Sequence, residues 1–156
     1  MVDETAGIDL GILIGLAYQG FTDQLRAALS AQGFDDLGGA YGYVFRALAE
    51  EELSQSEMAA RLGITEQGTA KILREMVDRR YVERRPDPDD ARVKRLRLAR
   101  RGREALAAAK RFHAGFEQRL VRDAGAGAVR TFRRLLQTVA RTDTHDDLAH
   151  ARLRAM

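Results

Sequence analysis

The chain contains, at residues 53–65, the sequence Leu53-Ser-Gln-Ser-Glu-Met-Ala-Ala-Arg-Leu-Gly-Ile-Thr65. Ser54 and Glu57 have the spacing of a capping box, in which the serine hydroxyl accepts a hydrogen bond from the backbone N–H of the glutamate, and the glutamate carboxylate accepts one from the backbone N–H of the serine. Leu53 and Met58 occupy the two positions of a hydrophobic staple around this cap. The sequence therefore predicts that a helix starts at Ser54.

A second helix follows almost at once. Gly63 is typical of a helix end, because glycine adopts the left-handed backbone conformation without strain, and Thr65 is a typical N-cap for the next helix. Apolar residues then recur at helical spacing at Leu73, Met76 and Val77. Two helices joined by a Gly-Ile-Thr turn predict a helix-turn-helix.

After the second helix the period of the sequence changes from 3.6 residues to 2. Residues alternate in Tyr81-Val-Glu-Arg-Arg85 and again in Val93-Lys-Arg-Leu-Arg-Leu98, which predicts two strands of a hairpin. Both prolines of the chain lie in the connection 86–92, which is expected to be an exposed loop. A helix-turn-helix followed directly by a hairpin is the pattern of a winged helix, in which the second helix enters the major groove of DNA and the hairpin loop reaches a flanking groove.

Helical periodicity also precedes this region. Apolar residues at helical spacing predict one long helix from Leu10 to Ala28 and a second helix through Val44 and Leu48 that ends near residues 50–52. The glycine-rich and acidic stretch 33–39 between them is predicted to be a loop.

Two further helices are predicted after the hairpin. Their apolar residues recur at helical spacing over residues 106–120 and 129–139, and residues 123–127 separate them. The terminal stretch 142–156 is polar and weakly periodic, so a last helical turn and a frayed tail both stay open.

Charge is distributed unevenly along the chain. The 26 basic and 23 acidic residues give a net charge of only +3, yet residues 1–60 hold 2 basic and 10 acidic residues, and residues 71–103 hold 13 basic and 6 acidic residues. A basic segment suits a polyanion, because lysine and arginine that neutralise phosphates release condensed counterions. From charge alone, a solvated arginine-rich surface is an equally good interpretation.

Composition excludes several classes of function. The 156 residues, 45% apolar and 31% charged, suit one compact domain with or without dimer-forming extensions. The absence of cysteine excludes disulfides, thiol nucleophiles, thiol redox sensing and cysteine metal sites. The sequence has no Walker loop, dinucleotide fingerprint or Gly-x-Ser-x-Gly elbow, so no enzyme and no cofactor are expected. The apolar run from Ile8 to Tyr18 is too short to span a bilayer and is interrupted by Asp9, so we expect a cytoplasmic protein without a membrane partner.

The three histidines do not predict a metal site. His145 and His150 lie in the polar terminal stretch and lack the helical i, i+3 or i+4 spacing of a ligand pair, so a solvated tail is favoured. His113 lies on an apolar helical stripe, where a hydrogen-bonded core histidine is favoured over a ligand.

These elements, in this order, resemble the MarR family of bacterial transcriptional regulators. The resemblance rests on residues 53–65, on Arg84-Arg-Pro-Asp-Pro-Asp-Asp-Ala-Arg92 and on Leu96-Arg-Leu-Ala-Arg-Arg-Gly102. It implies a mainly α fold with a small β-hairpin wing, in which a winged helix-turn-helix DNA-binding domain is flanked by N- and C-terminal dimerisation helices. The expected divisions are an N-terminal dimerisation helix in residues 1–36, the DNA-binding domain in 37–103 (helix-turn-helix 54–79, wing 81–98) and C-terminal dimerisation helices in 104–156.

The sequence departs from the family pattern at two positions, Ala99 and Gly68. The family commonly has a threonine after the second wing strand, where its hydroxyl caps the following helix, and this chain has Ala99, at an expected cost of about 0.5–2 kcal/mol. Gly68 lies inside the second helix of the helix-turn-helix, where glycine is unfavourable by roughly 1 kcal/mol relative to alanine. Close approach to DNA and close packing of helices would each explain Gly68, with packing slightly favoured.

Within this motif, polar residues of the second helix and of the wing are the candidate DNA contacts. Glutamine pairs with adenine and arginine with guanine, whereas lysine holds phosphates, and a solvated helix face is the alternative. The resemblance implies that Arg92 enters the minor groove and that Asp90 braces it. Phosphate contacts are expected from Arg84, Arg85, Lys94 and Arg95. The helix candidates are Thr65, Glu66, Gln67, Thr69, Lys71 and Arg74.

The resemblance also implies a small aromatic or amphipathic ligand between the dimerisation helices and the winged domain. The residues that could line such a pocket are Tyr18, Phe21, Tyr41, Tyr43, Phe45, Phe112, His113 and Phe116. Plain core packing is the favoured alternative for each, because aromatic stripes at helical spacing usually pack.

The predicted function is sequence-specific control of transcription. A homodimer would bind a pseudo-palindromic double-stranded operator with half-sites about 34–36 Å apart, as a repressor that a ligand releases. One alternative is a winged-helix ligand- or protein-interaction module without specific DNA binding, and another is an architectural DNA binder with little sequence preference.

Overall fold

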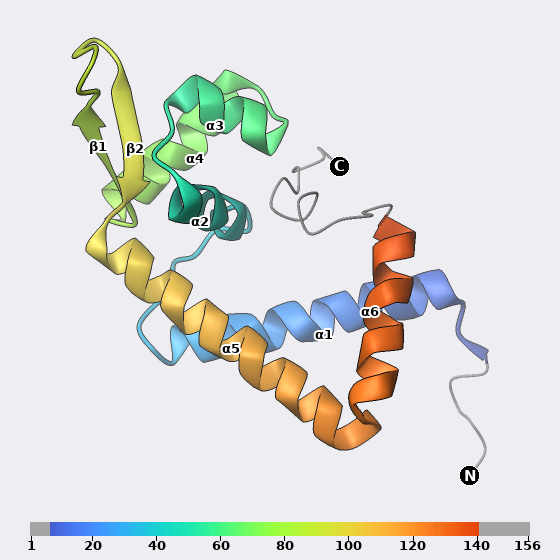
Figure 1. Ribbon diagram of the computed structural model, residues 1–156. Coiled ribbons are helices and arrows are strands. Elements are labelled where there is room, and N and C mark those ends of the chain that lie inside the picture. The colour runs from blue at the N-terminus through green and yellow to red at the C-terminus, as the bar shows by residue number, and fades with distance from the viewer. Residues whose placement is uncertain (1–6, 141–156) are drawn as a thin grey trace. The chain divides into compact units, whose positions relative to one another are not determined.

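The computed structural model describes residues 7–140 (Figure 1). They fall into two compact units that divide between Asp35 and Asp36, and each unit is described by itself. The first contains one helix, α1 (Leu10–Ser30). The second contains α2 (Tyr41–Glu50), α3 (Gln55–Leu62), α4 (Glu66–Asp78), β1 (Val82–Pro86), β2 (Lys94–Leu98), α5 (Arg100–Ala124) and α6 (Ala126–Ala140). Among these residues no helix is both long and apolar enough to cross a membrane.

The helix-turn-helix has the local structure that its capping residues predict. The backbone N–H of Glu57 donates to the Ser54 hydroxyl at 3.2 Å, and the backbone N–H of Ser54 donates to the Glu57 carboxylate at 2.7 Å. Gly63 ends α3 in the left-handed conformation with φ 68°. The Thr65 hydroxyl accepts from the backbone N–H of Gly68 at 3.1 Å and so caps α4. The predicted helix start, turn and second start are confirmed.

The wing is a two-stranded antiparallel hairpin that is fastened to the rest of the unit at its base. Val82 pairs with Leu98, Arg84 with Leu96 and Pro86 with Lys94. Leu96 also exchanges two backbone hydrogen bonds with Leu53, of 3.3 and 2.8 Å. The residue before α3 therefore forms an isolated antiparallel β-bridge with β2. Both strands begin one residue later than predicted, because Tyr81 lies in the core before β1 and Val93 belongs to the loop. The first strand also extends to Pro86, which was expected in the loop and is instead paired with Lys94 at the end of the hairpin.

The core of the second unit lies where α2, α3, α4 and the hairpin meet. Five of its residues are fully buried, with 0% exposure: Val44, Met58, Leu73, Met76 and Tyr81. The first turn of α5 lies directly against this core at Gly102, where an added Cβ would lie 2.1 Å from the carbonyl oxygen of Tyr81. Only glycine fits this close approach without movement of the backbone.

A polar cluster ties the end of α4 to the start of the second unit. Arg79 donates to the Asp36 carbonyl at 2.6 Å and to the Tyr41 hydroxyl at 2.9 Å. Arg101 donates to both carboxylate oxygens of Asp36, at 3.0 and 3.2 Å, and the Tyr81 hydroxyl donates to the same carboxylate. Partial burial would raise the pKa of Asp36, but the Tyr81 hydroxyl and the Arg101 cation outweigh it and hold that pKa below its usual range.

The C-terminal helices are longer and closer together than predicted. α5 ends at Ala124 and α6 starts at Ala126, so the break is one residue, Gly125, with φ 84°, rather than the stretch 123–127. Since glycine alone tolerates this conformation, a single residue suffices to turn the chain between them. An ion pair of 2.8 Å between Arg133 and Glu117 links the two helices.

Candidate nucleic-acid interface

The face of α4 opposite the core presents three long polar side chains. Gln67, Lys71 and Arg74 are exposed, whereas Leu73 and Met76 on the other face are fully buried. The three residues follow each other at i, i+4 and i+7, which places them in one row along the helix. Within residues 7–140 none of the three takes part in an ion pair or a side-chain hydrogen bond. Their amide, ammonium and guanidinium groups are therefore available to an external partner.

The first turn of α4 is partly occupied by contacts inside the protein. Thr65 is exposed, but its hydroxyl serves as the N-cap. Glu66 accepts a hydrogen bond from the Ser56 hydroxyl at 2.7 Å, which joins α4 to α3. Both side chains lie at the surface, and each can still contact a base, because the Thr65 hydroxyl keeps its proton to donate and the Glu66 carboxylate keeps a second oxygen to accept.

Thr69 was expected to contact DNA, but its side chain is not accessible. Its side chain is 0% exposed, and its hydroxyl donates to the Thr65 carbonyl oxygen at 3.0 Å. Thr69 shares the buried face with Leu73 and Met76, at spacings of four and three residues. This spacing was the signal in the sequence that places Thr69 in the core.

Gly68 is not explained by close helix packing, the explanation that the sequence slightly favoured. An added Cβ would meet the Thr65 hydroxyl oxygen at 3.2 Å and a side-chain carbon of Ile64 at 3.9 Å, and no atom of another helix lies within 4 Å. The contact with the N-cap hydroxyl is tight, so a side chain at position 68 would require that hydroxyl to move slightly.

Arg92 lies at the tip of the wing loop, whose backbone is held by several hydrogen bonds. Arg92 is exposed, and its backbone N–H donates to the Asp90 carboxylate at 3.0 Å. Asp90 was expected to brace Arg92, and its carboxylate contacts the backbone N–H of that residue. The reason is local, because an aspartate side chain readily accepts from the N–H two residues further on.

The four expected phosphate contacts of the wing differ in how far they are engaged elsewhere. Arg84 and Lys94 are exposed, and Lys94 makes only a long contact of 3.4 Å to the Ala91 carbonyl. Arg85 pairs with Glu52 at 2.8 Å. Arg95 is 30% exposed and pairs with two carboxylates. Arg84 and Lys94 are therefore the most accessible cations of this group.

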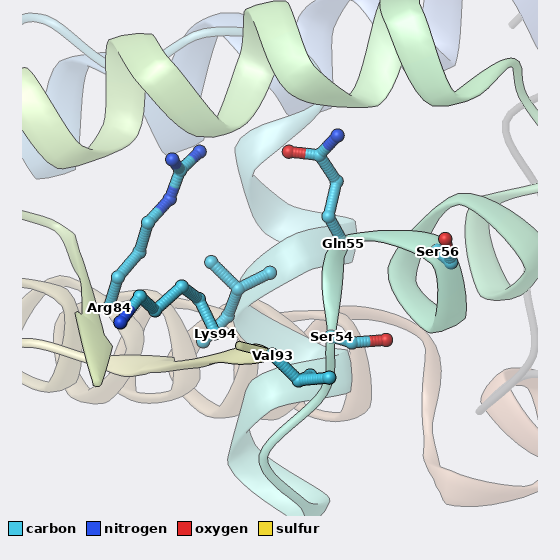
Figure 2. Close-up of a pocket in the computed structure, with 7 residues that line it drawn as sticks. Ser54, Gln55, Ser56, Arg84, Val93 and Lys94 are labelled. Carbon is cyan, nitrogen blue, oxygen red and sulfur yellow. The ribbon is translucent and has the colours of Figure 1, made fainter. Parts of the chain in front are cut away.

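A cleft of about 400 Å³ separates the start of α3 from the wing. Figure 2 shows Gln55 and Arg84 on opposite sides of this cleft, with their side chains extending in the same direction. Gln55 could not be identified from the sequence, because nothing local shows that the first residue of α3 faces the wing. The cleft is lined by Ser54, Gln55, Ser56, Arg84, Val93, Lys94 and Leu96.

Two of the eight aromatic ligand candidates belong to the core. Tyr41 and Phe45 are 2% and 4% exposed and pack around Tyr81, with ring centroids 5.8 and 5.6 Å from the Tyr81 ring. The hydroxyl of Tyr41 accepts from Arg79. These two side chains are buried by packing among the core rings, which corrects the ligand expectation for both.

The remaining candidates of the second unit lie nearer the surface. Phe112 and Phe116 are half-buried and stack at 6.1 Å. His113 is largely exposed rather than a core residue, and partial desolvation together with the Arg46 cation lowers its pKa. Tyr43 is half-buried on α2. On α1, Tyr18 is 66% exposed and Phe21 is half-buried.

No group of three or more His, Cys, Asp or Glu residues suitable for a metal ion occurs within residues 7–140. His145 and His150 lie outside the residues that the structure describes.

Comparisons with known proteins place this architecture in a family. Residues 35–93 match the model of the MarR family. The exopolysaccharide II synthesis transcriptional activator ExpG of Rhizobium meliloti (strain 1021) is 30% identical over 112 residues, which are 72% of this chain and 58% of that protein. The chain thus spans less than two thirds of this relative.

Solved structures of the same family share the fold. The reduced form of MarR from E. coli is 25% identical with a TM-score of 0.64, over 85% of this chain and 96% of that chain. The transcriptional repressor CouR, solved on a 23-mer DNA duplex, is 25% identical with a TM-score of 0.67, over 88% of this chain and 96% of that chain. The predicted fold, mainly α with a β-hairpin wing, is confirmed, and residues 35–93 of the chain match the MarR family.

Proposed function

We propose that this protein regulates transcription by binding specific double-stranded DNA with α4 and the wing. The observation that carries the proposal is the unengaged row of Gln67, Lys71 and Arg74 on α4. The exposed cations Arg84, Arg92 and Lys94 of the same unit supplement this row. A helix with such a row fits the major groove, and a cationic hairpin fits the backbone and the minor groove beside it.

Each group has a task that suits its chemistry. The Gln67 amide can pair with both groups that adenine presents in the major groove, and the Arg74 guanidinium can do so with guanine. The compact charge of Lys71 suits a phosphate. The planar cation of Arg92 suits a narrow, electronegative minor groove. Arg84 and Gln55, on the two sides of the cleft, are placed for a phosphate between the wing and α3.

The protein acts as a homodimer in this proposal. On α6, Phe132, Leu135, Leu136 and Val139 are 39–62% exposed, and α1 exposes Leu10, Ile12 and Leu16 at 51–69%. Apolar faces of this extent mark interaction surfaces, and a second copy of the chain offers the same faces. We therefore assign dimerisation to residues 1–36 and 104–156 and DNA binding to 37–103. A two-fold dimer reads a pseudo-palindrome with half-sites about 34–36 Å apart.

A small ligand would release the DNA if it binds better to a dimer whose two α4 helices have the wrong spacing. Phe112, His113, Phe116 and Tyr43 are the candidate ligand contacts in the second unit, and Tyr18 and Phe21 those on α1. We propose repression as the direction of control, although ExpG is described as an activator. Such a regulator acts where the chromosome is, in the cytoplasm.

A matched pair of lysine variants tests the DNA contact. Lys71→Ala and Lys110→Ala each remove one exposed lysine, from α4 and from α5 respectively. If Lys71 meets a phosphate, its variant binds every DNA sequence less tightly and flattens the plot of log affinity against log salt by about one unit. The Lys110 variant should match the wild type. Equal behaviour of the two variants would refute the assignment of α4, and binding of no DNA at low salt would favour an interaction module.

A further inference from the structure

Arg95 joins the wing to the first helix of the helix-turn-helix. Its guanidinium donates to the Glu57 carboxylate at 2.6 Å and to the Asp87 carboxylate at 2.5 Å. The Glu57 oxygen that accepts from Arg95 is the one that also accepts from the backbone N–H of Ser54. The cap of α3 and the wing therefore share one carboxylate oxygen.

Asp87 extends this connection into the wing loop. Its side chain is 9% exposed, and its second carboxylate oxygen accepts the backbone N–H groups of Asp89 and Asp90 at 2.8 and 3.2 Å. Asp90 in turn accepts the backbone N–H of Arg92. One series of hydrogen bonds thus runs from the cap of α3, through Arg95, to the backbone of Arg92 at the tip.

The charge states of the two carboxylates favour these ion pairs at neutral pH. Hydrogen bonds from Arg95 and from the loop N–H groups hold the pKa of Asp87 below its usual range. The Ser54 N–H and the Arg95 cation do the same for Glu57. Both carboxylates are therefore ionised at neutral pH, so two negative charges face one arginine. The three groups together carry a net negative charge, which disfavours a phosphate beside Arg95.

We propose that Arg95 is a positioning residue, which locks the wing loop to α3 and so holds Arg92 ready for the minor groove, and that it is not a phosphate contact. This inference rests on the proposed DNA binding. A loop that is ordered before binding loses less conformational freedom when the complex forms, so affinity increases without a new contact to DNA. It revises the expectation for Arg95, and it leaves Arg84 and Lys94 as backbone contacts.

The test compares Arg95→Gln with Arg84→Gln, because each variant removes one arginine of the wing. Hydrogen exchange of the Asp89 and Asp90 amides is measured on the free protein, and DNA affinity is measured across a salt series. In Arg95→Gln the two amides should exchange about tenfold faster and affinity should fall by about tenfold with an unchanged salt slope. In Arg84→Gln exchange should stay as in the wild type and the slope should flatten by about one unit.

A second variant keeps the test decisive. Asp87→Asn removes the other end of the connection, so it should speed the same amides, and the double variant with Arg95→Gln should be no worse than either single variant. A salt slope flattened by one unit in Arg95→Gln, with exchange unchanged, would overturn the proposal and make Arg95 a phosphate contact. The exchange measurement needs no DNA. If the wild type binds no DNA, the proposed function fails while exchange still shows whether the connection exists.

Discussion

A hydroxyl at position 99 should stabilise the protein. Ala99 is the N-cap of α5, with φ −71° and ψ 171°, and gives the helix no side-chain hydrogen bond. The N–H groups at the start of this 25-residue helix therefore lack the acceptor that serine or threonine would supply. Replacement of a good N-cap by alanine costs about 0.5–2 kcal/mol, so Ala99→Thr should raise the free energy of unfolding by about the same amount.

Ala99→Val is the matched control, because valine has the shape of threonine without its hydroxyl. For a chain of 156 residues, 1 kcal/mol corresponds to about 2–4 °C in Tm, so Ala99→Thr should melt about 1–8 °C above Ala99→Val. Both are measured by calorimetry at one protein concentration, since association changes the apparent stability. Equal melting of the two variants would refute the reasoning, because it would show that water or backbone already satisfies these groups.

Two further predictions concern contacts around Tyr81. Gly102→Ala should destabilise the fold by about 1–3 kcal/mol or more in urea unfolding, since the new Cβ would lie 2.1 Å from the Tyr81 carbonyl; an unchanged midpoint would refute the close approach. The lowered pKa of Asp36 stabilises the protein above the unfolded pKa near 4, and this contribution is lost as the pH falls through the folded pKa. Asp36→Asn should therefore be less stable at pH 7 and show a smaller loss on acidification, and parallel pH profiles would contradict this.

The parts of the fold that are set by neighbouring residues could be predicted from the sequence. Ser54, Gly63 and Thr65 act on backbone groups within three residues, so their types and spacing suffice. The hairpin followed from alternation and from its two prolines, of which Pro86 ends β1 and Pro88 lies in the loop. The predicted break between α5 and α6, residues 123–127, was too long, because composition could not show that Gly125 alone makes the turn.

The parts of the site that depend on distant residues could not be predicted. Arg95 pairs with Glu57 across 38 positions, and no local pattern distinguishes it from the solvent-facing arginines beside it. The Asp36 cluster joins residues up to 65 positions apart and was missed for the same reason. Thr69 differs, because its spacing from Leu73 and Met76 was visible in the sequence, and its place near the start of the second helix was nevertheless taken to favour a base contact.

The most direct test of the central claim is selection of DNA by the purified full chain from sheared DNA of its own genome, followed by titration of the fragments recovered. We predict enrichment of a few fragments that carry an inverted repeat with half-sites one helical turn apart, two chains bound per duplex, and affinity at least 10³-fold above scrambled DNA at physiological salt. Equal retention of all fragments would contradict sequence-specific control, and retention of none at low salt would contradict DNA binding itself.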